Sequence, residues 1–277
     1  MNDTAAAPRS TSAARSPDLG TRIASGAVMM VVALGCLWAG GLPFRLLVTG
    51  AAVLMMAEWA GLVHATRWRQ WLAALFAFGL VIALGEIAAT PEYWLGGSPS
   101  ALRPILVFSV GATLLLALVT LHVRLAIGLL YAALPALALI YLRDQQGLVL
   151  TVWAMALVWA TDIGAFFAGR AIGGPKLAPR VSPNKTWAGL IGGVIAAEVL
   201  SLVFAFGFGL SWAAVYYATF LAIMAQVGDL FESWLKRRAG VKDSGRLLPG
   251  HGGALDRLDG LVPVALIVAG LAIAGQL

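Results

Sequence analysis

The sequence predicts an all-α, polytopic integral membrane protein with about nine transmembrane helices, a cytosolic N-terminus and two polar cytosolic loops that together form a site. Three observations lead to this prediction. Of the 277 residues, 60% are hydrophobic and only 12% are charged, whereas a soluble domain is about half apolar and about a quarter charged. Apolar windows of about 20 residues, the length that crosses a bilayer, recur along the chain. Lysine and arginine gather in alternate connections between these windows, as they do in cytosolic loops.

The apolar windows give the expected helices in chain order. A tail at 1–22, rich in Ala, Ser and Arg and without apolar periodicity, is expected to be disordered and cytosolic. The expected helices are 23–40, 45–63, 71–89, 105–122, 125–142, 148–168, 187–208, 212–231 and 261–274. Residues 23–143 are thus an N-terminal group of transmembrane helices, and residues 144–277 are a C-terminal transmembrane region that contains both large polar loops.

The distribution of cations predicts the orientation. With the N-terminus in the cytosol, all but three of the 19 Lys and Arg residues fall on the cytosolic side, the exceptions being Arg45, Arg103 and Arg143. The positive-inside rule therefore places the polar loops at 169–186 and 236–259 in the cytosol. The same rule accounts for most of the net charge of +6, so nucleic acid is not an expected partner.

Three acidic residues lie where the sixth and eighth expected helices approach the cytosol. An acid inside a membrane helix costs a few kcal/mol on insertion scales, so each needs a partner or a purpose. Asp162, Asp229 and Glu232 all fall within about two turns of a cytosolic helix end. They therefore share the depth of the polar loops, which favours a common site. Snorkelling at helix ends with acid–base pairing is the alternative explanation.

The eighth expected helix also carries a polar stripe. Asp229, Glu232, Ser233, Lys236 and Arg237 recur at i, i+3, i+4, i+7 and i+8, which puts them on one helix face. Such a stripe indicates a wet or ligand-filled interior.

The other acids of the apolar windows, Glu58, Glu86 and Glu198, are solitary. For each, pairing with a hydroxyl or backbone group of a neighbouring helix explains the residue at least as well as function does. We assign them no role from the sequence.

The first polar loop contains "RVSPNKTWAGLIGG". Ser182 followed by Pro183 predicts an N-cap and a first helical position, which would put Lys185 in the first turn of the seventh helix. Free backbone N–H groups together with a lysine form an anion site, for which phosphate is the natural ligand. A purely topological, positive-inside role for Lys185 is the alternative. The GxxxxGK[ST] motif is absent from the sequence, so this is not a nucleotide P-loop.

The second polar loop contains "HGGALDRLD". Asp256 and Asp259 are spaced i, i+3 and can share one cation if this segment is helical, while Gly252 and Gly253 let the backbone approach a ligand closely. Carboxylates among several Lys and Arg residues suit a polyphosphate bound with Mg²⁺. Zinc is disfavoured because His251 has no second Cys or His nearby.

The stretch at 233–259, "SWLKRRAGVKDSGRLLPGHGGALDRLD", closely resembles the signature of phosphatidate cytidylyltransferases, also called CDP-diacylglycerol synthases. Its Ser-x-x-Lys-Arg, Lys-Asp, His-Gly-Gly and Asp-Arg-x-Asp elements all stand at the family's spacing. The upstream segments "TDIGAFFAGR", "SPNKTWAGLIGG" and "GDLFES" are also similar to that family. Asn184, Ala254 and Gly260 depart from the residues common there, and none of these changes removes a candidate ligand.

The resemblance implies an enzyme that transfers a cytidylyl group from CTP to phosphatidic acid, giving CDP-diacylglycerol and pyrophosphate in phospholipid biosynthesis. It implies a multi-pass protein of the inner (cytoplasmic) membrane, with Mg²⁺ as cofactor and an active site that takes CTP from the cytosol and the lipid from the inner leaflet. A second, monovalent cation and a homodimer are left open.

The resemblance also implies the site residues. The catalytic ones are Asp229, Lys242, His251, Asp256, Arg257 and Asp259, of which the three aspartates hold the Mg²⁺. The substrate-binding ones are Asp162, Arg170, Ser182, Lys185, Thr186, Glu232, Ser233, Lys236, Arg237, Asp243, Gly252 and Gly253.

Three rival classes agree less well with the sequence. A proton-coupled transporter would place its acids near the bilayer midplane in repeated halves, whereas these acids cluster at one face. A CDP-alcohol phosphatidyltransferase would carry an Asp-Gly-x-x-Ala-Arg motif, but Asp259 and Gly260 are followed by "LVPV". A purely structural scaffold would leave the two polar loops without an explanation.

Overall fold

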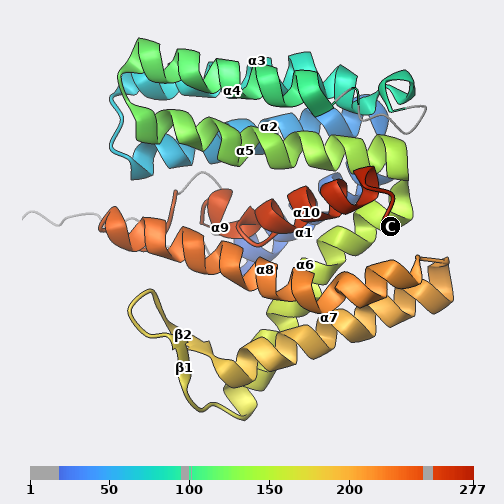
Figure 1. The fold of residues 1–277 in the computed structure, drawn as a ribbon. Helices are drawn as coiled ribbons and strands as arrows, with labels where there is room; N and C mark the ends of the chain where they lie inside the picture. Colours follow the sequence, from blue (N-terminus) through green and yellow to red (C-terminus); the bar gives the residue numbers. More distant parts are fainter. Residues whose placement is uncertain (1–18, 95–99, 101, 246–251) are drawn as a thin grey trace, which may run out of the picture.

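The structure is a computed structural model that describes residues 19–94, 100, 102–245 and 252–277, with side chains from residue 26 onward. Helices dominate it (Figure 1). In chain order the elements are α1 (Leu19–Ala39), α2 (Gly41–Leu62), α3 (Arg67–Ala89), the 3-10 helix η1 (Pro91–Tyr93), α4 (Leu102–Thr120), α5 (Val123–Tyr141), the π-helix η3 (Leu142–Gln146), α6 (Leu148–Ala171), β1 (Lys176–Ala178), β2 (Ser182–Thr186), α7 (Trp187–Phe208), α8 (Trp212–Arg238), α9 (Leu255–Leu258) and α10 (Leu261–Ile273).

Seven helices in the described part of the chain, α2 to α8, are long and apolar enough to cross a membrane, with η3 continuing α5. Two further apolar helices are shorter, one over Gly26–Ala39 within α1 and the other α10 itself. The prediction of a helical, multi-pass membrane protein is therefore confirmed. The count of nine spans and the cytosolic N-terminus stay predictions.

A two-stranded hairpin lies between α6 and α7 and is an addition to the all-α prediction. Strands β1 and β2 are antiparallel, with Lys176 opposite Thr186 and Ala178 opposite Ser182. The hairpin extends from the helices at the lower left of Figure 1, beside the ends of α6 and α8.

The predicted N-cap of the seventh helix at Ser182 was wrong, whereas the apolar window 187–208 matches α7. Ser182 and Pro183 lie on β2, because this segment pairs with β1 before the helix begins. The N-cap is instead Thr186, whose hydroxyl accepts a hydrogen bond from the Gly189 N–H at 3.0 Å. Lys185 is consequently held on a strand that enters the helix and does not lie in its first turn.

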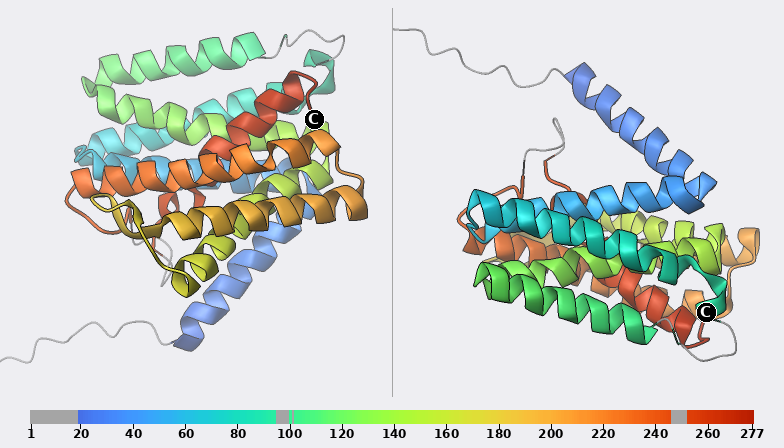
Figure 2. Two further views of the ribbon diagram at one scale, coloured as in Figure 1. Left: turned by 60° about the horizontal axis from the view of Figure 1, so that its bottom comes forward. Right: turned by 90° about the horizontal axis from the view of Figure 1, so that it is seen from above.

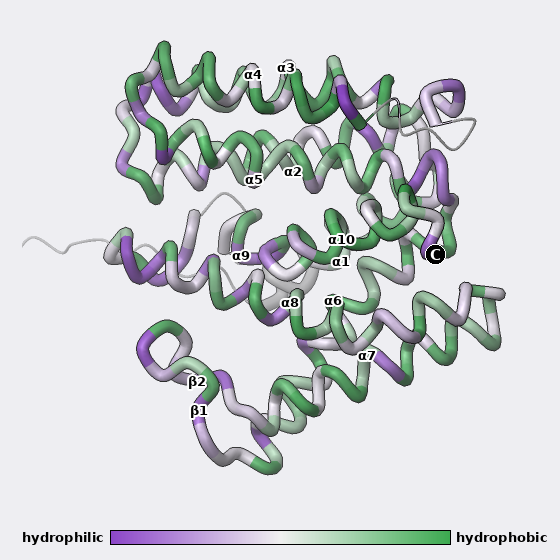
Figure 3. Tube along the Cα trace, in the orientation of Figure 1, coloured by the Kyte–Doolittle hydropathy of each residue, from purple (hydrophilic) through white to green (hydrophobic). Residues whose placement is uncertain are grey.

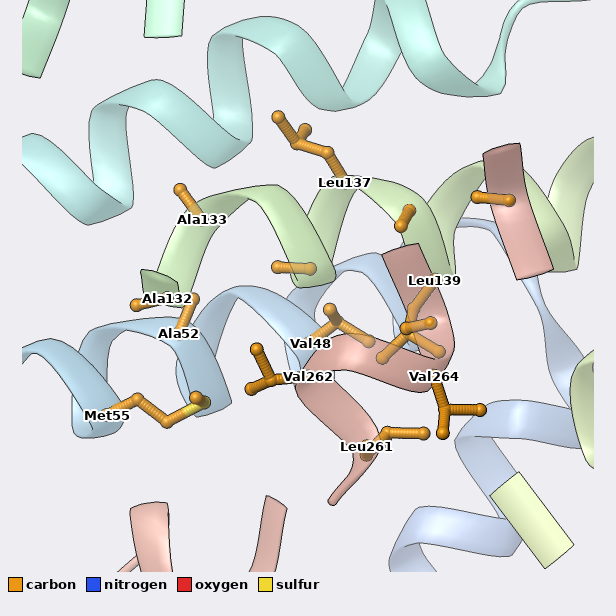
Figure 4. Packing of buried hydrophobic residues seen from close by; sticks show 14 of the residues in the cluster. Val48, Ala52, Met55, Ala132, Ala133, Leu137, Leu139, Leu261, Val262 and Val264 are labelled. Carbon is orange, nitrogen blue, oxygen red and sulfur yellow. The ribbon is translucent and has the colours of Figure 1, made fainter. Parts of the chain in front are cut away.

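Helix α5 is the central helix of the N-terminal part. Its span together with η3 is 78% buried, more than any other candidate span, because α2, α3, α4 and α10 all pack around it. Figure 4 shows the contact where Val48 of α2, Leu139 of α5 and Val264 of α10 meet. Inside a bilayer such close side-chain packing, and not exclusion from water, holds helices together.

Helices α6 and α7 approach each other unusually closely. A Cβ atom on Gly192 of α7 would lie 2.2 Å from the Ala168 Cβ of α6, which is too short for a contact between carbon atoms of different residues. Small residues at a membrane helix interface permit such backbone contact. This packing fixes the C-terminal part of α6 against the start of α7, which follows the hairpin.

The polar connections of the C-terminal region gather at one end of the molecule. In Figure 3, the hairpin and the C-terminal end of α8 carry hydrophilic residues, as do chain segments at the right-hand end of the molecule, whereas the helix middles are mostly hydrophobic. The chain's C-terminus lies at the opposite end from the hairpin (Figure 1). Helix α1 diverges from the other helices in both views of Figure 2 and packs chiefly on α2.

Candidate active site

A cluster of polar side chains centred on Lys185 joins α6, β2 and α8. The Lys185 Nζ lies 2.6 Å from Asp229 Oδ2 and donates a hydrogen bond to Gln226 Oε1 at 2.9 Å. The Gln226 Nε2 donates to Asp162 Oδ1 at 3.3 Å, and the Ser233 hydroxyl donates to Asp229 Oδ1 at 3.3 Å. We call these five residues the Lys185 cluster. It unites four predicted residues from three separate sequence segments, together with Gln226.

Asp259 lies next to this cluster because α8 and the start of α10 touch. A Cβ on Gly228 would lie 2.3 Å from the Asp259 carbonyl oxygen, so a glycine at this position lets the two backbones meet. Burial, followed by the Asp229 carboxylate, raises the pKa of Asp259 to about 7. Two carboxylates that repel each other in this way attract a cation between them, and oxygen ligands suit Mg²⁺.

A second cluster is centred on Lys236. Its Nζ lies 2.5 Å from Glu232 Oε2 on the same helix and 2.6 Å from Asp256 Oδ1. The Asp256 Oδ2 accepts hydrogen bonds from the Ser244 and Gly253 N–H groups at 3.1 and 2.9 Å. Burial acts to raise the pKa of Asp256, but its contacts with Glu232, Lys236 and the Gly253 N–H outweigh burial and hold that pKa well below its usual range.

The three predicted metal ligands therefore fall into two places. Asp229 and Asp259 approach each other, whereas Asp256 belongs to the Lys236 cluster. Within residues 19–94, 100, 102–245 and 252–277, no three His, Cys, Asp or Glu side chains form a group that could hold a metal ion. The predicted polar stripe of α8 is divided between the same two clusters. Asp229 and Ser233 belong to the Lys185 cluster, whereas Glu232 contacts Lys236.

The remaining predicted residues belong to neither cluster. Arg237 is exposed, and its Nε donates to the Val181 carbonyl oxygen at 3.5 Å, which connects α8 to the hairpin. Thr186 is buried as the N-cap of α7. The exposed ones are Arg170, Lys242, Asp243 and Arg257, and Ser182 is half-buried. Gly252 has a φ of +81°, a left-handed conformation that favours glycine. His251 lies outside the described residues.

Comparison with known proteins identifies the family of the chain. The model of the family described as "Cytidylyltransferase family" matches residues 20–273. The chain belongs to that family. The match extends over both the N-terminal helices and the C-terminal region that carries the two clusters, so the first half of the chain is part of the family domain.

Several individual relatives of the chain carry the same protein name. A Brucella suis protein named phosphatidate cytidylyltransferase is 43% identical over 91% of this chain and 92% of its own length. A Helicobacter pylori protein of the same name is 34% identical over 89% of each chain, and one from Bacillus subtilis is 47% identical over 42% of this chain. The predicted resemblance is confirmed, and the chain is a nucleotidyltransferase.

Three residues in or beside the two clusters, Gln226, Ser244 and Glu58, were not predicted from the sequence. Gln226 precedes Asp229 by three positions and so continues the predicted stripe, a signal that was available. Ser244 had no signal of its own. Glu58 looked solitary because its partners, Ser244 and the segment at 254–255, lie in the other half of the sequence.

Proposed function

We propose that the protein transfers the cytidylyl group of CTP to phosphatidic acid. An oxygen of the lipid phosphate forms a bond to the α-phosphorus of CTP, the bond from that phosphorus to the oxygen bridging to the β-phosphate breaks, and pyrophosphate leaves with the electron pair. Family membership and the names of the relatives support this reaction. The observation that carries it is that Lys185 pairs with Asp229, with Asp259 close enough to interact with both, at one end of a largely apolar helix bundle.

The residues present suit this chemistry. A phosphate monoester is already anionic near neutral pH, so the reaction needs charge neutralisation and alignment more than a strong general base. Lys185 is the cation best positioned to bind a substrate phosphate, because its ammonium group is fixed by Asp229 and Gln226. Arg237, whose side chain contacts the Val181 carbonyl oxygen of the hairpin, adds a further positive charge beside β2.

We propose that Asp229 and Asp259 hold the Mg²⁺ ion. Asp259 lies in a buried position whose pKa is raised first by burial and then by the Asp229 carboxylate, which supports this assignment, and Asp162 reaches the same cluster through Gln226. When bound, Mg²⁺ supplies charge stabilisation at the phosphates. Asp256 as a third ligand stays a prediction, because its carboxylate belongs to the Lys236 cluster and not to the place where Asp229 and Asp259 approach each other.

The two clusters lie where a water-soluble nucleotide and a membrane lipid could both reach them. Both clusters lie at the end of α8 where the chain changes from apolar to strongly basic, with Lys236, Arg237 and Arg238 in the last turn. We propose that this end faces the cytosol across the inner membrane, since the positive-inside rule favours it. CTP then enters from the cytosol, and phosphatidic acid enters sideways from the inner leaflet.

An assay of the purified protein tests the reaction. The protein in detergent micelles is incubated with cytidine-labelled CTP and Mg²⁺, with or without phosphatidic acid. We expect label in the lipid fraction only when phosphatidic acid is present, and none with diacylglycerol, which lacks the attacking phosphate. A folded protein that labels neither lipid contradicts the proposed function.

A further inference from the structure

Glu58 is an acid of α2 that lies far in sequence from both polar loops but is buried against the second. Its side chain belongs to a residue only 4% exposed. An acid at such a position in a membrane helix is costly unless it finds strong partners. Glu58 finds them outside its own helix. Its Oε1 accepts a hydrogen bond from the Ala254 N–H at 2.8 Å, and its Oε2 accepts from the Leu255 N–H at 2.9 Å.

Glu58 also contacts the chain that precedes the Gly-Gly segment. The Ser244 hydroxyl oxygen lies 2.8 Å from Glu58 Oε2 and 3.0 Å from Asp256 Oδ2, so its single proton lies between two carboxylate acceptors. Glu58 therefore fixes the polar loop from both flanks, before residue 246 and after residue 252. Ser244 further links Glu58 to the carboxylate that Lys236 binds.

The fit around Glu58 leaves no spare room. A Cβ on Gly253 would lie 2.4 Å from Glu58 Oε2 and 2.0 Å from the Ser244 hydroxyl oxygen. The carboxylate thus occupies space that the glycine leaves open, so this glycine is required for contact within the protein as well as for any approach to a ligand.

We propose that Glu58 is a positioning residue for the transferase reaction. It acts through the loop, because the N–H groups that it accepts from belong to the residues just before Asp256 and at the start of α9, which leads to Asp259. The N-terminal helices thereby set the geometry of acids in the C-terminal region. This inference rests on the proposed function, which supplies the reaction that Glu58 serves.

The substitution Glu58→Gln tests it with little change of shape. An amide has only one acceptor oxygen, so its NH₂ group must face either the Ala254 or the Leu255 N–H, and one backbone donor loses its partner. A displacement of about 1 Å near reacting groups lowers turnover on the order of 100-fold. We expect a fall in kcat of roughly 10- to 100-fold with KM for CTP changed much less.

A matched control is Glu86→Gln, the same chemical change at an acid whose side chain is 73% exposed and paired with Arg45 at 2.8 Å. We expect its kcat to equal that of the wild type. Hydrogen exchange provides a readout besides activity: the amides at 252–258 should exchange faster in Glu58→Gln and at the wild-type rate in Glu86→Gln. Equal kcat and equal exchange in the two variants would overturn the proposal.

If Glu58→Gln does not fold, a second variant tests the positioning role of Glu58. Ser244→Ala removes only one of the three hydrogen bonds, and we expect a several-fold lower kcat with faster exchange at 252–258. A wild-type kcat together with a wild-type exchange rate in Ser244→Ala would contradict the positioning role of Glu58. If the wild-type protein itself makes no CDP-diacylglycerol, the proposed function fails, whereas the exchange measurements still decide whether Glu58 fixes the loop.

Discussion

Replacing Lys185 by glutamine removes the cation at the centre of the Lys185 cluster. The lysine side chain is 16% exposed and its partner Asp229 is 31% exposed, with 2.6 Å between Nζ and Oδ2. A hydrogen bond to a charged group in such a setting contributes about 1.5–3 kcal/mol, and about 1.4 kcal/mol corresponds to a tenfold change in rate. Because Lys185 is proposed both to bind a substrate phosphate and to fix Asp229, we expect Lys185→Gln to lower kcat/KM by roughly 10- to 1000-fold.

The hairpin offers a matched control for this prediction. Lys176 lies on β1, opposite Thr186, and is exposed. Lys176→Gln removes the same charge from the same hairpin, and we expect it to retain the wild-type kcat/KM. Both variants are purified in detergent, and CDP-diacylglycerol formation is measured per folded molecule alongside the unfolding temperature. Equal kcat/KM in the two variants would refute the reasoning and return Lys185 to a purely topological role.

Three further predictions address the metal, the packing and the orientation. Asp229→Asn and Asp259→Asn should each lower turnover by roughly 1000-fold with unchanged expression, and folded variants that keep their turnover and Mg²⁺ dependence would contradict the assignment. Gly192→Ala should destabilise the protein by about 1–3 kcal/mol in thermal unfolding because its Cβ collides with α6, whereas Gly207→Ala, with open space around it, should not. In a cysteine-free background, Arg180→Cys should react with an impermeant thiol reagent only after right-side-out vesicles are opened, and labelling of sealed vesicles would reverse the orientation.

The helices were predictable from the sequence because membrane spans obey a simple rule. About 20 apolar residues cross a bilayer, so hydropathy alone gave windows close to the observed helices, for example 187–208 against α7 over Trp187–Phe208. The hairpin was not predictable in this way. Ser182 and Pro183 carry a helix-start signal, and the pairing with β1 overrides that local preference.

The candidate site was predictable as a set of residues but not as a set of contacts. Helical spacing placed Asp229 and Lys236 on one face, yet their partners come from β2 and from α9. The pairing of acids with lysines depends on how closely α8 approaches α10. Gly228 permits this close approach, but nothing in the sequence distinguishes it from the other glycines. The contacts of Glu58 were even less predictable from the sequence, because its hydrogen-bond partners are 186 to 197 residues away along the chain.

The fate of the individual phosphates of CTP tests the central claim most directly. Wild-type protein is given phosphatidic acid, Mg²⁺ and CTP labelled either at the α-phosphate or at the γ-phosphate. Cytidylyl transfer predicts that the α label enters the lipid fraction and the γ label leaves as pyrophosphate, with both transfers strongly reduced in Lys185→Gln and unaffected in Lys176→Gln. Label from the γ-phosphate in the lipid, or no lipid label from folded wild-type protein, would contradict the account.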